Sequence, residues 1–433
     1  MTADSSRYAE ILDLTHDGKG VADIEGRRVF VSGALVGEEV RIELKKGRRR
    51  NKNDLQALEI ARASANRVEP GCEYFGRCGA CAIQHMSYGA QLAFKQQVVA
   101  QAFSRIGGLQ PTEWLEPVAS PQWAYRRRAR LGARYVEGKG RALVGFRERA
   151  APYVTDMNHC PVLVPPIGNA IGDLASTLTL ARSARRIPQF EVAIGDAAGA
   201  LVVRALDPLP VEDETLFLEF GKKLDLDVYV QTGGPGTVRP LAQARTLFYS
   251  LDEFDVRIEF APTDFIQVNA IINKLMVKEA VDVSGIGATD NVLDLFCGVG
   301  NFSLPFARKA ARVVGVEGDA GLVARAAKNA ELNKLDNCQF ITADLMQGGW
   351  SVLREPWDVV VLDPPRSGAA ALGSDWAAMS PRRIVYVSCH PATLARDAKV
   401  LSEEHGYVMS TARVFDMFPN THHAEVMAVF DRQ

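Results

Sequence analysis

The chain of 433 residues contains no run of eighteen consecutive apolar residues, and its first ten residues, MTADSSRYAE, lack the basic start and apolar core of a signal peptide. We therefore expect a cytoplasmic protein without a membrane span. An excess of one charge is also missing, because 50 Lys and Arg residues face 52 Asp and Glu residues. The overall charge thus indicates no nucleic-acid partner, and any surface for one must be local.

The composition shows no strong bias either. It is 47% hydrophobic and 24% charged, which is typical of a globular protein and argues against a disordered, collagen-like or coiled-coil chain. At about 150 residues per domain, the length predicts roughly three domains.

The positive charge is gathered in two places. Residues 45–52 hold six cations in eight positions, and residues 126–149 hold nine Lys or Arg against Glu137 and Glu148. Clustered cations can displace the counterions of a phosphate backbone, so they favour RNA or DNA binding. Either stretch alone could equally be a solvated loop.

The first two thirds of the sequence predict a small barrel and a mixed region. Residues 8–61 alternate short apolar runs with turns, which is typical of an all-β barrel resembling the oligonucleotide-binding (OB) type, although many such barrels bind no nucleic acid. After residue 88 a helical pattern runs to Gly107-Gly108, and short strands are predicted at 189–193, 200–205 and 226–230. The mixture indicates an α+β region whose topology the pattern does not specify.

From residue 290 the pattern alternates strands and helices. Apolar runs at 292–296, 312–316, 339–342, 358–362 and 384–388 are separated by helical stretches that include 320–332 and 391–404. Such alternation predicts a parallel sheet covered on both faces, with ligands beyond the carboxyl ends of its strands. Segments 407–415 and 424–430 predict a closing antiparallel hairpin.

A glycine-rich turn follows the first of these strands. In Asp294-Leu-Phe-Cys-Gly298-Val-Gly300 the glycines allow a ligand to approach the backbone, but Ser303 replaces the third glycine of a dinucleotide site. Glu317 and Asp344 follow the next two strands. This arrangement looks like a class I S-adenosylmethionine (SAM) methyltransferase, in which Glu317 would bind the ribose diol and Asp344 would lie near the adenine.

Two further motifs suggest chemistry on a pyrimidine. Asp363-Pro-Pro-Arg366 follows the fourth strand, and Cys389 follows the fifth at the start of a predicted helix, where the helix N-terminus should lower the thiol pKa. Carbon 5 of uracil becomes nucleophilic only after a thiolate has added to C6, and the adduct must then lose its C5 proton to a base. A buried inert thiol is the commoner fate of a lone cysteine.

Four other cysteines suggest a metal site. Cys72, Cys78 and Cys81 lie within ten residues, and Cys160 is a plausible fourth ligand. A reducing compartment disfavours disulfides, so metal ligation is the better interpretation. The spacing alone leaves zinc and an iron-sulfur cluster open.

These motifs together resemble the RNA uracil-5 methyltransferase family. The resemblance rests on Phe265-Ile-Gln267-Val-Asn269, Asp294-Leu-Phe-Cys-Gly-Val-Gly-Asn301, Asp363-Pro-Pro-Arg, Ser388-Cys389-His-Pro and His-His-Ala-Glu425. It implies that Cys389 is the nucleophile, Glu425 the base, and Phe265 the residue that stacks on uracil. It also assigns these residues to the SAM site: Gln267, Phe296, Asn301, Glu317, Asp344 and Asp363.

The resemblance extends to the other regions. Residues 8–61, with Gly18-Lys-Gly20, resemble a TRAM RNA-binding barrel, and the four cysteines resemble the ligands of a 4Fe-4S cluster, with Ala80 where relatives usually have glycine. The combination is that of a branch that methylates a specific uridine of 23S ribosomal RNA. We expect a TRAM barrel at 1–62, a central α+β iron-sulfur domain at 63–262 and a Rossmann-like SAM-dependent methyltransferase domain at 263–433, acting as a monomer without a protein partner. RNA cytosine-5 methylation, another uracil site in rRNA or tRNA, and a non-catalytic RNA-binding assembly factor are the alternatives.

Overall fold

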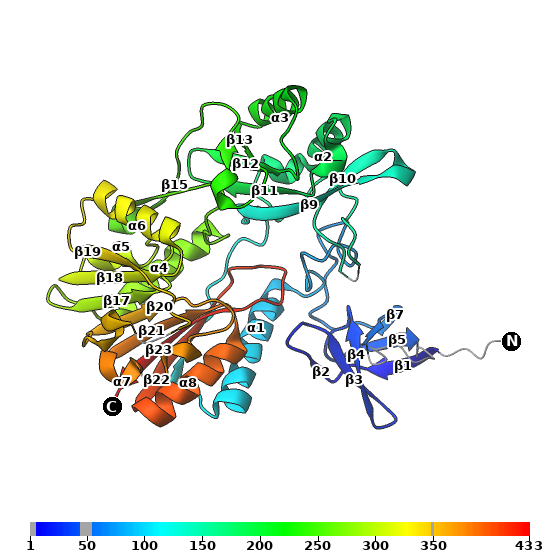
Figure 1. The fold of residues 1–433 in the computed structure, drawn as a ribbon. Coiled ribbons are helices and arrows are strands. Elements are labelled where there is room, and N and C mark those ends of the chain that lie inside the picture. Colours follow the sequence, from blue (N-terminus) through cyan, green and yellow to red (C-terminus); the bar gives the residue numbers. More distant parts are fainter. Residues whose placement is uncertain (1–5, 44–53, 150, 348–349, 374) are drawn as a thin grey trace.

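The computed structural model describes residues 6–43, 54–149, 151–347, 350–373 and 375–433. Figure 1 shows three regions: a small barrel near the N-terminus, a central region of sheet and helices, and a C-terminal sheet with helices on its faces. These are the three architectures that the sequence predicts. Among the described residues, no helix combines the length and apolarity that a membrane span requires.

The barrel consists of two small sheets, in the orders β1-β5-β7 and β2-β3-β4-β6. Alternate residues of its strands point inward and form a separate core that includes Val29, Val31 and Ile42. The basic run at 45–52 lies outside the described residues. The strands are β1 (Ser6–Glu10), β2 (Asp13–Leu14), β3 (Gly20–Ile24), β4 (Arg27–Ser32), β5 (Glu39–Glu43), β6 (Asp54–Gln56) and β7 (Glu59–Arg62).

A connecting segment leads from the barrel into the rest of the chain. It contains the first three cysteines of the expected cluster and then helix α1 (Tyr88–Ala102), which continues as a π-helical turn at Phe103–Gly107 and ends at Gly108. Strand β8 (Glu113–Trp114) pairs in parallel with β22 (Tyr407–Phe415) at the edge of the C-terminal sheet. This part of the predicted central region therefore packs on the C-terminal domain (Figure 1).

The central region contains a six-stranded sheet in the order β10-β9-β11-β12-β13-β14, on which two helices pack. A separate antiparallel hairpin, β15-β16, leads toward the C-terminal domain. The elements are β9 (Arg128–Val136), β10 (Arg141–Gly145), α2 (Ile171–Leu180), β11 (Gln189–Ile194), β12 (Gly199–Arg204), α3 (Val211–Lys223), β13 (Leu226–Gln231), β14 (Arg239–Pro240), β15 (Leu247–Leu251) and β16 (Val256–Phe260). The three strands predicted in this region are confirmed.

The C-terminal sheet has eight strands in the order β19-β18-β17-β20-β21-β23-β22-β8. Strands β17 to β21 are mutually parallel, and β23 inserts antiparallel between β21 and β22, so the predicted alternation and closing hairpin are confirmed. The elements are α4 (Ala270–Ser284), β17 (Asn291–Leu295), α5 (Ser303–Ala307), β18 (Arg312–Glu317), α6 (Ala320–Leu332), β19 (Cys338–Thr342), β20 (Val359–Leu362), α7 (Asp375–Met379), β21 (Arg383–Ser388), α8 (Pro391–His405), β22 and β23 (Glu425–Arg432).

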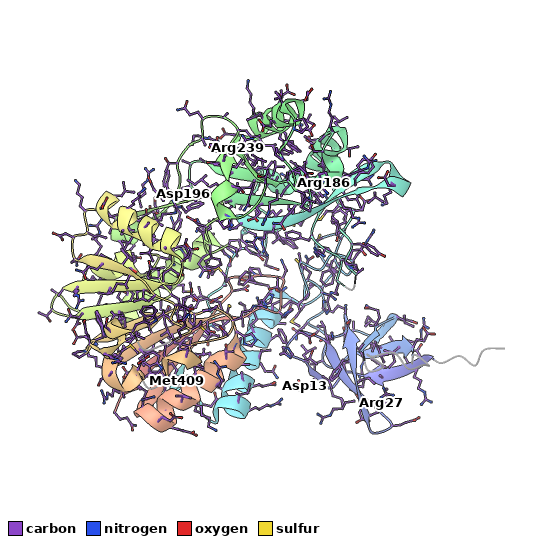
Figure 2. All side chains as sticks on the ribbon, viewed as in Figure 1. Asp13, Arg27, Arg186, Asp196, Arg239 and Met409 are labelled. Carbon is purple, nitrogen blue, oxygen red and sulfur yellow. The ribbon has the colours of Figure 1, made fainter. Side chains whose placement is uncertain are left out.

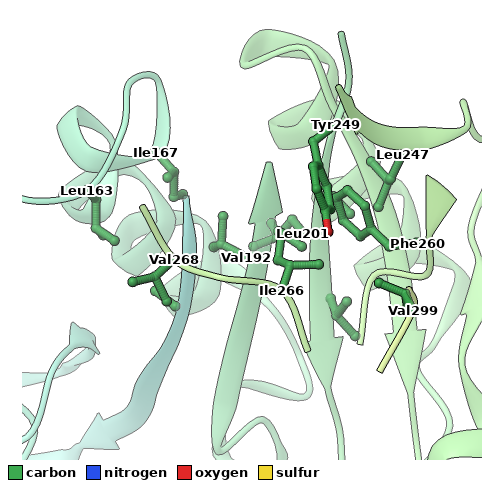
Figure 3. Packing of buried hydrophobic residues seen from close by; sticks show 14 of the residues in the cluster. Leu163, Ile167, Val192, Leu201, Leu247, Tyr249, Phe260, Ile266, Val268 and Val299 are labelled. Atoms are coloured by element: carbon green, nitrogen blue, oxygen red, sulfur yellow. The ribbon is translucent and has the colours of Figure 1, made fainter. Parts of the chain in front are cut away.

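The central and C-terminal regions share one hydrophobic core. Figure 3 shows Val192 and Leu201 of the central sheet near Ile266 and Val268, which precede α4. The same cluster reaches Val299 in the glycine-rich turn. Shared burial of this kind fixes the segment that carries Phe265 and Gln267 against the ends of the parallel strands.

Candidate active site

The turn after β17 has an unusual backbone. Phe296, Gly298 and Gly300 all have positive φ, of 64°, 56° and 93°. Such a conformation costs a non-glycine residue energy, and it recurs at ligand sites where the surrounding structure enforces it. A Cβ on Gly298 would meet nothing within 4 Å, so the turn faces open space that a ligand could fill.

The acidic residues predicted to bind SAM lie at the ends of neighbouring strands. The Oε2 atom of Glu317, at the end of β18, accepts the backbone N–H of Gly298 at 3.2 Å, and its Oε1 accepts that of Asp319 at 3.0 Å. Asp344, beyond β19, is exposed and accepts the N–H of Met346 at 3.0 Å. Both carboxylates are therefore held at the carboxyl edge of the sheet, where ligands of such folds bind.

Asp294 lies beneath the glycine-rich turn and is 1% exposed. It accepts the Ser303 hydroxyl, while its Oδ1 atom has no hydrogen-bond partner among the described residues. Burial raises the pKa of Asp294 to about 7, an effect that the Ser303 hydrogen bond opposes. An orphaned acceptor directly below an open turn fits a site that receives a polar ligand.

Asn301 is held by a hydrogen-bond network. Its side-chain amide exchanges two 2.9 Å hydrogen bonds with the amide of Asn273, and its Oδ1 also accepts the Tyr249 hydroxyl at 2.9 Å. These partners come from α4 and β15, so they join both regions at the carboxyl edge of the sheet. A contact of Asn301 to SAM stays a prediction.

Three groups converge where β20, β21 and β23 meet. Asp363 follows β20, Cys389 follows β21, and Glu425 begins β23. The antiparallel register pairs Ser388 with Val426, which brings the neighbouring Cys389 and Glu425 to the same end of the two strands. Gln267 joins them, because its Nε2 donates to Asp363 Oδ2 at 3.1 Å.

The buried acids of this cluster favour protons. Glu425 is 3% exposed, and burial followed by repulsion from Asp363 raises its pKa well above the usual range. Burial raises the pKa of Asp363 to about 7, while the hydrogen bond from Gln267 lowers it. The pair thus resists carrying two negative charges at neutral pH.

The expected lowering of the Cys389 pKa is wrong. Burial, together with the negative charges of Glu425 and Asp363, raises the thiol pKa to about 11, and Arg366 opposes this through its charge and a hydrogen bond. The desolvation and the two acids outweigh the helix N-terminus, because α8 begins only at Pro391 with His390 as its cap. Arg366 is therefore the group that lowers the thiol pKa, an effect that its place in the Asp363-Pro-Pro-Arg366 motif does not reveal.

A cavity of about 460 Å³ opens at Cys389. Its lining includes Arg366, His423 and Arg105, and it reaches His16 of the barrel. Phe265 is 67% exposed and does not line this cavity among the described residues, so its stacking on a base stays a prediction. The cavity gives a substrate access to the thiol from the side of the barrel.

The four cysteines expected to bind metal converge in the structure. Burial and the nearby Cys160, Cys78 and Cys72 raise the pKa of Cys81 to about 12, so the four thiols lie within range of one another's charge. Three are buried and Cys72 is partly exposed. No group of three or more His, Cys, Asp or Glu side chains in the described residues is arranged for a single metal ion.

The loop around these cysteines accommodates its unusual residue. Ala80 does not have positive φ, so its position does not need glycine. Gly79 does need to be small, because a Cβ there would lie 2.9 Å from the Arg147 carbonyl oxygen. The charges near these thiols are those of Glu73, which raises the pKa of Cys72, and Arg149, which opposes the raised pKa of Cys78.

Comparisons with known proteins agree with this geometry. A family model described as tRNA (Uracil-5-)-methyltransferase matches residues 249–347 and 352–433, and the TRAM domain model matches residues 7–55. The solved Pyrococcus abyssi tRNA (uracil-54, C5)-methyltransferase, in complex with S-adenosyl-L-homocysteine, superposes with a TM-score of 0.74 at 24% identity, covering 98% of this chain and 100% of that one. The chain has the fold of a SAM-dependent methyltransferase with an N-terminal TRAM domain, and it belongs to the RNA uracil-5 methyltransferase family.

Two relatives that match this chain along nearly their whole length share one name. The 23S rRNA (uracil(1939)-C(5))-methyltransferase RlmD of Stenotrophomonas maltophilia (strain R551-3) is 45% identical over 430 residues, which are 98% of this chain and 97% of that protein. The protein of the same name from Xylella fastidiosa (strain 9a5c) is 44% identical over 436 residues, with 99% and 98% covered. The family resemblance predicted from the sequence is thus confirmed.

Proposed function

We propose that this protein transfers a methyl group from SAM to carbon 5 of uracil 1939 in 23S rRNA, the target that the name of its 45% identical relative RlmD specifies. The observation that carries the proposal is the convergence of Cys389, Glu425 and Asp363 at one edge of a methyltransferase sheet. A thiol, a buried base and an adjoining cofactor turn are the parts that C5 methylation of a pyrimidine requires.

The cofactor would occupy the edge formed by the turn after β17 and the acids beyond it. The residues proposed to bind it are Gln267, Phe296, Asn301, Glu317, Asp344 and Asp363. Their fit rests on the open turn at Gly298 and on the unpartnered Oδ1 of buried Asp294. When bound, SAM would supply an electrophilic methyl group and a positive charge.

The protein's own residues would perform the remaining steps. Cys389 Sγ gives its proton to solvent water and adds to C6 of the uracil, which moves the electron pair of the C5–C6 double bond toward C5 and the C4 oxygen and makes C5 nucleophilic. Arg366 stabilises the thiolate, since its charge and hydrogen bond oppose the effects that raise the thiol pKa. Phe265 would stack on the base and hold its ring over the thiol.

Glu425 would complete the reaction. Once C5 carries the methyl group, the Glu425 carboxylate removes the C5 proton, the electron pair of that C–H bond re-forms the C5–C6 double bond, and Cys389 Sγ leaves C6. Its buried position beside Asp363 gives it a raised pKa and therefore a strong affinity for that proton. The adduct is released only when this proton has been taken.

The four cysteines Cys72, Cys78, Cys81 and Cys160 are proposed to hold a 4Fe-4S cluster that supports the fold. A four-iron cluster is wider than one ion, so its ligands stand farther apart than those of zinc, and convergent thiols without a single-ion geometry are compatible with it. The methyl-transfer groups lie elsewhere, at the ends of β20, β21 and β23.

RNA is proposed to bind across the side of the molecule where the TRAM barrel faces the Cys389 cavity. That cavity and a second one of about 500 Å³ on the barrel share His16, Gln101 and Arg105 in their linings, which supports a continuous path for a strand. Action as a monomer in the cytoplasm stays a prediction.

The test is incubation with methyl-labelled SAM and unmodified 23S rRNA, followed by nucleoside analysis and mapping of the label. We expect 5-methyluridine at uracil 1939. Label in 5-methylcytidine would indicate the cytosine reaction, label at another uridine would reject this target, and no label in any rRNA or tRNA would indicate a binding factor. The Cys389→Ala variant serves as the control for Cys389-dependent transfer.

A further inference from the structure

The loop at residues 416–424, which joins β22 to β23, leads directly into Glu425. It is buried along much of its length: Asp416 and Met417 are 0% exposed, and Asn420 is 1% exposed. A buried loop must find partners for its backbone polar groups within the protein. Those partners lie far earlier in the sequence. Gln91 and Asn420, for example, are hydrogen-bonded although 329 residues separate them along the chain.

Helix α1 supplies the first set of partners. Lys95 forms an ion pair with Asp416 in which both side chains are 0% exposed, and its Nζ also donates to the Phe418 carbonyl oxygen at 2.9 Å. One turn earlier on the helix, Gln91 Oε1 accepts the Asn420 N–H at 2.9 Å, and Gln91 Nε2 donates to Asn420 Oδ1 at 3.3 Å. Two side chains of one helix face therefore hold both the start and the middle of the loop.

The cysteine segment supplies the second set. The two residues after Cys81, Ala82 and Ile83, donate their backbone N–H groups to the Asn420 carbonyl oxygen at 2.9 and 3.1 Å. Tyr125, which precedes β9, donates its hydroxyl to the Pro419 carbonyl oxygen at 3.0 Å. The polar groups of Asn420 are thus divided among the cysteine segment, α1 and the Gln122 carbonyl oxygen, to which Asn420 Nδ2 donates at 2.9 Å.

The energetics favour a positioning role for these contacts. A fully buried ion pair is costly to desolvate and is weak evidence for stability, but it fixes geometry because either ion alone would be strongly unfavourable. Asn420 has a φ of 67°, so the loop turns sharply at the residue that receives the most partners. None of these side chains lines the cavity at Cys389 among the described residues.

We propose that α1 and the segment after Cys81 form a brace that positions Glu425 through the 416–424 loop, with Lys95 and Gln91 as its positioning residues. The inference rests on the proposed role of Glu425 as the base that releases the adduct. Its consequence is specific: loosening the brace slows proton removal from C5 more than it slows SAM binding or methyl transfer. The brace also makes the loop sensitive to the order of the cysteine segment.

The test uses Lys95→Met and Gln91→Leu in the full-length protein, with Lys223→Met as the matched control. Lys223 pairs with Asp173 on the surface, where the two side chains are 67% and 57% exposed. Single-turnover reactions with labelled SAM and 23S rRNA are followed on denaturing gels, which separate methylated protein–RNA adduct from free methylated RNA. Hydrogen exchange reports the order of residues 416–424, and SAM affinity is measured separately.

For both brace variants we expect SAM affinity within about twofold of wild type, faster exchange in the loop, and an adduct that persists about tenfold longer. The control should match wild type in all three. Release of the adduct at the wild-type rate despite faster loop exchange would overturn the inference, as would an equal decline of SAM binding, methyl transfer and release, which is the mark of a merely structural role.

A milder variant covers the case in which Lys95→Met fails to fold. Asn420→Gly keeps the backbone conformation, which glycine adopts freely, and removes only the side-chain hydrogen bonds of Asn420, including the one from Gln91. It should prolong the adduct by a smaller factor, and unchanged release would count against the brace. Wild-type protein that forms no Cys389-dependent adduct would reject the proposed function itself, whereas a normal wild-type adduct with unaltered variants rejects the brace alone.

Discussion

At the scale of single residues, the environment of the site raises the pKa values of its thiol and its two neighbouring carboxyl groups. The pKa of Asp363 is raised to about 7, that of the Cys389 thiol to about 11, and that of Glu425 well above its usual range, with burial as the largest cause each time. Two buried carboxyls that repel each other prefer to share one proton. Simultaneous ionisation of Cys389, Asp363 and Glu425 is therefore unfavourable at neutral pH.

Replacing the thiol separates binding from chemistry. In Cys389→Ala we expect methylation of 23S rRNA to fall by roughly a thousandfold or more, because the thiol that adds to C6 is gone. SAM affinity should stay within about twofold of wild type, since the thiol acts on the base. Label transfer and SAM binding are measured on the same preparation. Turnover near the wild-type rate would remove Cys389 from the mechanism.

Replacing the base should trap the substrate. Glu425→Gln keeps the size of the side chain and its hydrogen-bonding capacity but cannot accept the C5 proton, so the methylated RNA stays bonded to Cys389. We expect a persistent protein–RNA band that carries the methyl label on a denaturing gel. If Glu425 only filled the buried start of β23, the variant would be somewhat less stable and would release methylated RNA at a near-normal rate.

The raised pKa of Asp294 predicts that the stability of the fold depends on pH. Its folded-state pKa of about 7 lies above the ordinary value of 3.8, so the folded chain binds this proton more tightly than the unfolded chain does. The resulting stability is present below the unfolded pKa and is lost as pH rises from about 4 to about 7. Asp294→Asn has no proton to lose, and its amide oxygen can still accept from Ser303.

Thermal unfolding of both proteins at pH 5 and pH 8 checks this sign. The melting temperature of Asp294→Asn relative to wild type should be higher at pH 8 than at pH 5, by a few degrees. A difference that is the same at both pH values would mean that Asp294 titrates normally in the folded chain.

At the scale of elements, the sequence predicts those whose pattern is local. Strands β17 to β21 are near-continuous apolar runs and helix α6 is capped by Asp319, so their positions agree with expectation to within a residue or two. The two-residue strand β8 has no periodic signal, and its pairing with β22 depends on tertiary contact. Lys95 and Asp416 could not be paired from sequence, because nothing local links positions 321 residues apart.

The candidate site divides in the same way. Cys389, Asp363 and Glu425 each follow or begin a strand, so their meeting at one sheet edge follows from topology. The protonation states of these three groups do not follow from topology, because they depend on burial and on repulsion between side chains at the ends of three strands. The raised thiol pKa is therefore the main point at which the structure corrects the sequence.

The proposed 4Fe-4S cluster at Cys72, Cys78, Cys81 and Cys160 predicts the metal content of the protein. Anaerobically purified protein should be brown and contain about four irons per chain, and Cys81→Ser should lose iron, since one of four ligands is gone. Cys338→Ser, which changes a thiol in β19, is the control and should keep its iron. Colourless, fully active protein with one zinc per chain would decide against the cluster.

At the scale of the whole molecule, the second basic stretch contributes less surface charge than its sequence suggests. Arg127 is buried, and Arg128 donates to the carbonyl oxygens of Pro262 and Thr263 at 2.6 and 2.9 Å. Lys139 and Arg141 share Asp156. These cations therefore hold parts of the fold together. Arg134 and Arg147 are among the cations of the stretch that are exposed.

The last prediction tests which cations meet RNA. Neutralising the exposed pair with Arg134→Gln and Arg147→Gln, or the residues 48–50 of the first basic run, should raise the Michaelis constant for 23S rRNA. It should also lower the salt dependence of binding by about one unit of slope for each phosphate group that the variant no longer neutralises. SAM affinity should not change, because the residues proposed to bind SAM belong to neither set. Arg186 and Arg239 lie in the central region, apart from the barrel (Figure 2), and each pairs with an acid.

The Gln variants of Arg186 and Arg239 are the matched controls, since they remove the same charge at positions where the cation is already paired with an acid. RNA affinity is measured at two ionic strengths, and the controls should match wild type at both. The affinities of the test variants should approach that of wild type at high salt, because screening there weakens the attraction to phosphate for every protein. Equal effects of test and control variants would mean that only net charge matters. Unchanged RNA affinity in the test variants would make both basic stretches ordinary solvated surface and would leave the barrel and the cavity at Cys389 as the sites that select the RNA.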